Sequence, residues 1–175
     1  MKPRLIILSD LFGEKKSGWK QKYITSLEPY FEIKYYDCCE LGNIDKYDFT
    51  EKTLHEQYLK TGVELAVEKI IEKEKELVNV LAFSIGGVIA WKAALKGLKI
   101  RNLFAVSSTR LRHETKKPAG DIFLYFGEND YFVPERSWFE ELDVNSTLLP
   151  FKDHNMYRES DCASTVCKKI ISKLI

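Results

Sequence analysis

Long apolar runs are missing from this sequence, and their absence limits the classes of protein to which it fits. Near the N-terminus, the apolar core extends only from Leu5 to Leu8, which is shorter than the apolar segment of a signal peptide. No other run approaches the roughly 18 residues that cross a bilayer as a helix. The sequence therefore predicts a protein with no membrane partner.

Net charge and cysteine are also scarce. The formal net charge is +1, so no overall field attracts a polyanion, and nucleic acid is not an expected partner. The four cysteines are the adjacent Cys38 and Cys39 and the separate Cys162 and Cys167. Neither spacing matches a zinc-ligand pattern or a disulfide framework. Free thiols of this kind indicate a cytoplasmic protein, and the sequence implies no metal and no organic cofactor.

Repeats, low-complexity segments and linkers rich in proline or glycine are absent as well, and no shift in composition marks a boundary. A chain of 175 residues fits one domain, and a core of this size buries roughly two-thirds of the surface of the unfolded chain. We therefore expect a single domain over residues 1–175.

What the sequence does contain is an alternation of short apolar runs and amphipathic stretches. The expected strands cover residues 4–10, 31–37, 77–84, 101–108, 121–127 and 146–151. The expected helices cover residues 19–27, 88–98, 135–142 and 159–174, with one more after Thr50 and another beyond Gly62. This alternation is typical of a mostly parallel sheet with right-handed crossovers. The sequence therefore predicts an α/β protein, a single three-layer α/β/α domain with about six strands.

Three chemically suitable side chains follow different expected strands. Ser84 ends the strand at 77–84, Asp130 follows the strand at 121–127, and His154 follows the strand at 146–151. The carboxyl ends of parallel strands lie at one edge of a sheet, where ligand chemistry collects. We therefore expect these three side chains at the same edge.

The segment around Ser84 reads LAFSIGG, in which small residues flank the serine at Ala82 and Gly86. A nucleophilic serine has to project from a sharp, strained turn between a strand and a helix, and that turn leaves room only for small neighbours. The amides at the start of the next helix then point toward the serine and can hold an anion. The alternative is an inert joint between strand and helix, which the motif alone does not exclude.

Alternatives also exist for the other two positions. Asp130 can instead cap the helix that begins near Pro134, or form a turn with Asn129. A single histidine in a loop is often only a solvated residue. The rival acids are Glu128 and Asp153, and the rival bases are His55 and His113. The joint occurrence of serine, acid and histidine, in that order and at strand ends, favours the catalytic interpretation.

These motifs resemble those of the α/β-hydrolases along nearly the whole chain. The matching segments are IILSDLFG, YYDCCELG, LAFSIGGVIAWKAA, LYFGENDYFVP and FKDHNMY. The resemblance implies that Ser84 is the nucleophile, His154 the general base, and Asp130 the residue that orients and stabilises the imidazolium. It also implies an oxyanion hole made by the backbone N–H groups of Ile85 and Leu11.

The chain departs from the family pattern at two places. Ala82 stands where the family has the first glycine of its serine motif, and Ser9-Asp10 stands where many members have His-Gly. A backbone donor survives the second change, but a carboxylate directed toward the oxyanion would weaken it. The Leu11 amide is therefore a less certain donor than the Ile85 amide.

The surroundings predict an open site with no cap domain, because only residues 109–120 lie where family members often insert a lid. This loop carries four cations, Arg110, Arg112, Lys116 and Lys117. Arg110 and Arg112 are candidate substrate-lining residues, although a solvated loop balanced by Glu114 is the simpler interpretation. The aromatic candidates for the lining are Phe12, Phe83, Tyr131 and Phe132.

Together these features predict a small, lidless serine hydrolase that cleaves a carboxylic ester or thioester. The substrate is expected to be a small molecule or an acyl group on a carrier. The alternative is a protein-binding module that keeps the fold while its triad is idle, as the changes at Ala82 and Ser9-Asp10 would allow.

Overall fold

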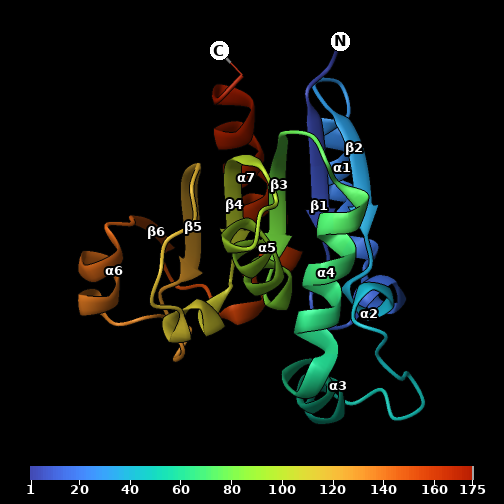
Figure 1. Cartoon of the computed structure of the whole chain (residues 1–175). Coiled ribbons are helices and arrows are strands. Elements are labelled where there is room, and N and C mark those ends of the chain that lie inside the picture. The colour runs from blue at the N-terminus through green and yellow to red at the C-terminus, as the bar shows by residue number, and fades with distance from the viewer. Residues whose placement is uncertain (175) are drawn as a thin grey trace.

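The chain folds around one sheet, as a computed structural model that describes residues 1–174 shows (Figure 1). The strands are β1 (Arg4–Leu8), β2 (Glu32–Tyr36), β3 (Val78–Phe83), β4 (Ile100–Val106), β5 (Asp121–Gly127) and β6 (Ser146–Leu149). Their order is β2-β1-β3-β4-β5-β6, and every neighbouring pair is parallel. The expectation of a mostly parallel sheet of about six strands is confirmed.

Helices cover both faces of the sheet. The α-helices are α1 (Gln21–Leu27), α2 (Cys38–Leu41), α3 (Glu51–Gln57), α4 (Val63–Lys73), α5 (Ile85–Leu95), α6 (Arg136–Leu142) and α7 (Ser160–Ser172). Short 3-10 turns are η1 (Gly13–Lys16), η2 (Gly18–Lys20), η4 (Thr109–His113) and η5 (His154–Arg158). Successive side chains of β1 point alternately into the two hydrophobic cores, one on each face of the sheet. Ile6 and Leu8 pack with α3 to α6, whereas Leu5 and Ile7 pack with α1 and α7.

Gly62 does not end a helix, which corrects the expectation of two separate helices. A π-helical turn, η3 (Tyr58–Gly62), joins α3 to α4, and Gly62 keeps helical dihedral angles. A Cβ atom on Gly62 would lie 2.5 Å from Cδ1 of Ile44. The glycine therefore permits close packing between this helix and the loop before α3. Thr50 caps the start of α3 as expected, because its hydroxyl accepts a hydrogen bond from the Thr53 amide.

A membrane-crossing helix is absent from the described residues, since none of their helices is sufficiently long and apolar.

Candidate active site

Ser84 lies at the sharp turn between β3 and α5, with φ of 48° and ψ of −116°. This is a strained conformation for a residue with a side chain, and such strain concentrates at functional sites. Two residues later, a Cβ atom on Gly86 would lie 2.4 Å from the backbone oxygen of Ser9. Only glycine permits this approach between α5 and the end of β1. The structure therefore contains the strained turn that the LAFSIGG motif predicts.

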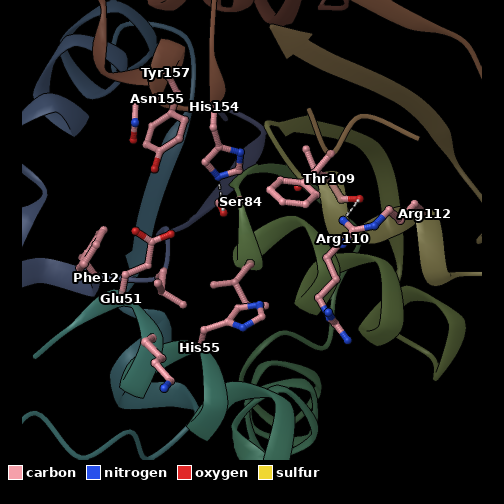
Figure 2. A pocket seen from close by; sticks show the side chains of 14 residues that line it. Phe12, Glu51, His55, Ser84, Thr109, Arg110, Arg112, His154, Asn155 and Tyr157 are labelled. Atoms are coloured by element: carbon pink, nitrogen blue, oxygen red, sulfur yellow. Dashed lines mark hydrogen bonds between the residues drawn. The ribbon is translucent and has the colours of Figure 1, made fainter. Parts of the chain in front are cut away.

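The three side chains expected at the sheet edge are in contact. Ser84 Oγ lies 3.1 Å from His154 Nε2, and His154 Nδ1 lies 2.8 Å from Asp130 Oδ2. If the imidazole donates Nδ1–H to the carboxylate, Nε2 is free to accept the serine proton. Figure 2 shows the His154 ring directed at Ser84, with a dashed line between the two.

Asp130 does not cap α6, because its carboxylate is used elsewhere. Oδ2 contacts His154, and Oδ1 accepts a hydrogen bond from the Phe132 amide at 3.1 Å. Burial opposes ionisation of this carboxyl, but the hydrogen bonds from His154 and Phe132, with the charge of Arg112, outweigh it and lower the pKa of Asp130. The group is therefore an anion at neutral pH.

Backbone hydrogen bonds bring the loop after β5, which holds Asp130, together with the loop after β6, which holds His154. The Asn129 amide donates to the Lys152 carbonyl at 2.8 Å, and the Glu128 amide donates to the Leu149 carbonyl at 3.0 Å. These bonds continue the pairing of β5 with β6 beyond the ends of both strands. The relative position of Asp130 and His154 is therefore determined by the sheet itself.

The rival acids have other partners. Glu128 accepts a hydrogen bond from the Phe151 amide, and Asp153 accepts one from the Asn155 amide. Of the rival bases, His55 lines the cavity from α3, whereas His113 borders a separate hollow. Neither histidine forms a hydrogen bond with Ser84 among the interactions of residues 1–174.

The two expected oxyanion donors border the cavity beside the serine. Leu11 and Ile85 both line it together with Ser84. Within residues 1–174, no protein group accepts a hydrogen bond from either amide. Ile85 is the first residue of α5, where the amides carry the positive end of the helix dipole. Both N–H groups are therefore available to a ligand.

Asp10 does not turn its carboxylate into the cavity. The residue is only 1% exposed, and its carboxylate accepts hydrogen bonds from the Phe12 amide at 3.0 Å and the Tyr157 hydroxyl at 2.9 Å. Arg158 lies 3.4 Å away. Burial raises the pKa of Asp10, although these three groups oppose the rise. The carboxylate therefore joins the loop that holds Leu11 to the turn that holds His154.

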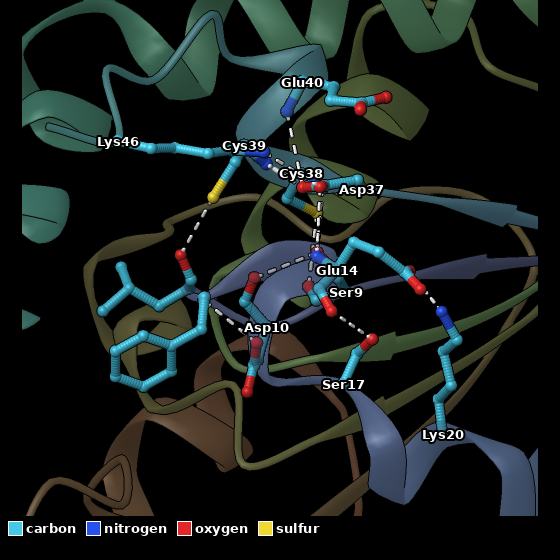
Figure 3. A network of polar contacts seen from close by, with 12 residues as sticks. Ser9, Asp10, Glu14, Ser17, Lys20, Asp37, Cys38, Cys39, Glu40 and Lys46 are labelled. Carbon is cyan, nitrogen blue, oxygen red and sulfur yellow. Dashed lines mark hydrogen bonds and ion pairs between the residues drawn. The ribbon is translucent and has the colours of Figure 1, made fainter. Parts of the chain in front are cut away.

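Ser9 belongs to a second polar network, which holds the same loop from the other side (Figure 3). Its hydroxyl donates to the Asp10 carbonyl at 3.0 Å and accepts from the Cys38 amide at 2.8 Å. The Asp37 carboxylate accepts from the amides of Cys39 and Glu14 at 2.7 and 3.0 Å. The change from His-Gly to Ser9-Asp10 therefore comes with a set of loop contacts that use both new side chains.

Replacement of Asp10 by alanine is expected to destabilise the protein by about 2–4 kcal/mol, because three donors lose a buried acceptor. Asp10→Asn keeps an acceptor for the Phe12 amide and should cost less. Urea unfolding followed by circular dichroism measures both, with Asp121→Ala as the control at an acid that is mostly exposed. Equal midpoints for Asp10→Ala and the wild type would contradict the role given to this carboxylate.

A cavity of about 720 Å³ opens beside Ser84 and His154. Of the expected lining residues, Phe12, Phe132, Arg110 and Arg112 do line it. Phe83 and Tyr131 do not, which corrects two expectations. Phe83 is the last residue of β3 and points to the opposite face of the sheet, where it packs with Trp19, Tyr23 and Tyr157. Tyr131 is 97% exposed and faces solvent.

One wall of the cavity comes from α3, a helix that the sequence motifs did not predict at the site. Glu51, Lys52 and His55 contribute side chains to this wall. Figure 2 shows Glu51 and His55 on the far side of the cavity from His154. The sequence signal was the spacing of Glu51 and His55, which are four residues apart and so share one face of the helix that Thr50 caps.

Glu114 does not balance the arginines of its loop, and this corrects the simpler interpretation of that loop. Its carboxylate pairs with Lys92 of α5 at 3.2 Å, and its backbone oxygen accepts from Trp138 Nε1. Lys117 pairs with Asp143, away from the cavity. Arg110 and Arg112 thus face the cavity without that counter-charge.

No protein-family model matches the chain, and no curated protein matches it. Solved structures do match. A proposed hydrolase of the alpha/beta superfamily from Xanthomonas campestris pv. campestris has a TM-score of 0.68 at 17% identity, over 98% of this chain and 99% of that one. Carboxylesterase CesB (YbfK) from Bacillus subtilis has a TM-score of 0.63 at 12% identity, over 99% of this chain and 84% of that one.

A third similar structure is the NocB thioesterase domain, solved as a covalent complex with a fluorophosphonate nocardicin G analogue. Its TM-score is 0.56 at 15% identity, over 98% of this chain and 95% of that one. Identities this low carry the architecture but not the chemistry. These three similar structures agree with the parallel sheet and with the strained turn at Ser84. The chain therefore has the fold of the α/β-hydrolase superfamily.

Proposed function

We propose that the protein hydrolyses a carboxylic ester or thioester through an acyl-enzyme on Ser84. The observation that supports this most is the continuous hydrogen-bonded chain from Ser84 through His154 to Asp130, at a strained turn that opens into a cavity. An inert joint between strand and helix has no need for a histidine and a buried carboxylate aligned on its serine.

In the proposed mechanism, Ser84 Oγ attacks the acyl carbon while His154 Nε2 takes its proton. The Ile85 and Leu11 amides stabilise the negative charge on the carbonyl oxygen of the tetrahedral intermediate. His154 then returns the proton to the leaving alcohol or thiol. Water, deprotonated by the same imidazole, attacks the acyl carbon of the acyl-enzyme. The bond from this carbon to Ser84 Oγ then breaks, the imidazolium returns the proton to Oγ, and the acid is released. Asp130 stabilises the imidazolium in both halves of the cycle.

The substrate proposal rests on two kinds of support. The similar structures include a carboxylesterase and a thioesterase domain. Within the described residues, the segment between β4 and β5 contains only the short turn η4, so no cap domain covers the cavity. An open site of this kind suits a small ester or an acyl group carried on a larger molecule.

Labelling with a fluorophosphonate is expected to modify wild-type protein at Ser84, as found by peptide mass mapping. The reagent reacts only with a serine whose proton a neighbouring base removes, so Ser84→Ala and His154→Ala should both abolish the adduct. Circular dichroism of each variant checks that it is folded. Folded wild type that forms no adduct would overturn the proposal and leave a binding role for the fold.

A further inference from the structure

Cationic side chains outnumber acids around the cavity. Lys52, Arg110 and Arg112 line it, and Glu51 is the one acid among the lining residues that the structure describes. A second acid, Asp130, is buried against His154 and acts on Arg112. A neutral ester needs no such excess of positive charge. The formal net charge of the protein is only +1, so cations are not in excess over the molecule as a whole. The excess is therefore a property of this site.

Arg110 has the most unused hydrogen-bonding capacity of the three. Within residues 1–174, no protein group forms an ion pair, hydrogen bond or cation–π contact with its guanidinium. Arg112, by contrast, donates to the Thr109 carbonyl at 3.0 Å and stacks over the Phe132 ring at 5.3 Å. Arg110 is half-buried, so its five N–H donors are only partly hydrated.

The acids near Arg110 on its other side are already paired. Arg110 also borders a smaller hollow of about 250 Å³ that contains Glu64 and Glu114. Glu64 pairs with Lys96 at 2.5 Å, and Glu114 pairs with Lys92 at 3.2 Å. Neither carboxylate therefore neutralises Arg110.

The positive field reaches His55 on the opposite wall. Burial, then Arg110, and more weakly Arg112, lower the pKa of His55, and together they outweigh Glu51 and Glu56, which raise it. The imidazole is therefore neutral at pH 7 and can donate one hydrogen bond beside the guanidinium. Figure 2 shows Glu51 next to Phe12 on one side of the cavity and Arg110 on the other, with His55 between them. The acid and the free arginine thus occupy different parts of the site.

We propose that the cavity binds an ester or thioester that carries a carboxylate besides its scissile bond, and that Arg110 holds this carboxylate with help from Arg112 and His55. A guanidinium matches a carboxylate with two parallel N–H···O bonds, which are stronger than bonds between neutral groups. This inference rests on the proposed function, because it specifies the substrate of the same site.

Matched pairs of esters test the inference and locate the carboxylate. In the acyl arm, mono-4-nitrophenyl adipate is compared with 4-nitrophenyl hexanoate, in which a methyl group replaces the carboxylate. In the leaving-group arm, 4-carboxyphenyl hexanoate is compared with phenyl hexanoate. At least one anionic ester is expected to have a kcat/KM about 10-fold or more above that of its neutral partner, as a charge-assisted hydrogen bond allows.

Variants connect this preference to the named residues. Arg110→Gln should bring the ratio of anionic to neutral kcat/KM close to one, and Arg112→Gln should lower it partly. Glu51→Gln should raise the ratio, because it removes the acid from the cavity. Lys116→Gln is the control from the same loop, since Lys116 does not line the cavity, and it should keep the wild-type ratio.

A second readout does not depend on turnover. Free adipate should slow fluorophosphonate labelling of Ser84 in wild type but not in Arg110→Gln. Ratios at or below one in both arms, or a preference that survives Arg110→Gln, would overturn the carboxylate inference while ester hydrolysis stands. Absence of both hydrolysis and labelling would instead overturn the proposed function, and the inference with it.

Discussion

Replacement of Ser84 by alanine is expected to lower kcat for ester hydrolysis by about 10⁴-fold or more, because no other group can form the acyl-enzyme. His154→Ala should cause a loss of similar size, since the hydroxyl 3.1 Å from the imidazole then keeps its proton. The double variant should be hardly slower than either single variant, because the two side chains act as one unit.

Ser108→Ala is the matched control for this measurement. Ser108 is a buried serine near the same edge of the sheet, and within the described part of the chain its hydroxyl has no hydrogen-bond partner. Its loss should change kcat less than about threefold, as expected for a substitution that removes no interaction. If Ser108→Ala reduced activity as strongly as Ser84→Ala, the effect would come from disturbance of the sheet edge and not from loss of the nucleophile.

The sequence predicted the sheet and the positions of the triad because both depend on local patterns and one general constraint. Each strand is a short apolar run, and the carboxyl ends of parallel strands share an edge. Ser84 and His154 are separated by 70 residues, yet each needed only to follow its own strand to come within hydrogen-bonding distance of the other. No knowledge of long-range packing was required.

The wall of the cavity depends on contacts that local patterns do not specify. The position of α3 follows from the π-helical turn and from the packing of Gly62 against Ile44. The sequence pattern instead suggested a break at the glycine. The charge around Arg110 depends likewise on Glu114, whose partner Lys92 lies on a different helix. In both cases the decisive neighbour is distant in sequence.

The orientation of Phe83 is different, because the sequence did contain the signal. Side chains of a strand alternate between the two faces of the sheet. Ala82 belongs to the core beneath α5, so the next residue has to face α1 and α7. Proximity to Ser84 in sequence suggested a lining role, but the alternation directs the Phe83 ring into the core with Trp19 and Tyr23, where it is fully buried. Tyr157, which does line the cavity, comes from the turn after His154.

Asp130→Asn is expected to lower kcat by about 10³–10⁴-fold while the protein remains folded. The amide nearly preserves the shape of the carboxylate but not its charge, and it no longer enforces the tautomer in which His154 Nδ1–H donates to the acid. Asp153→Asn is the matched control beside the same histidine. Its carboxylate serves the Asn155 amide, so a loss of only a few-fold is expected. A larger loss for Asp153→Asn would reverse the choice of acid.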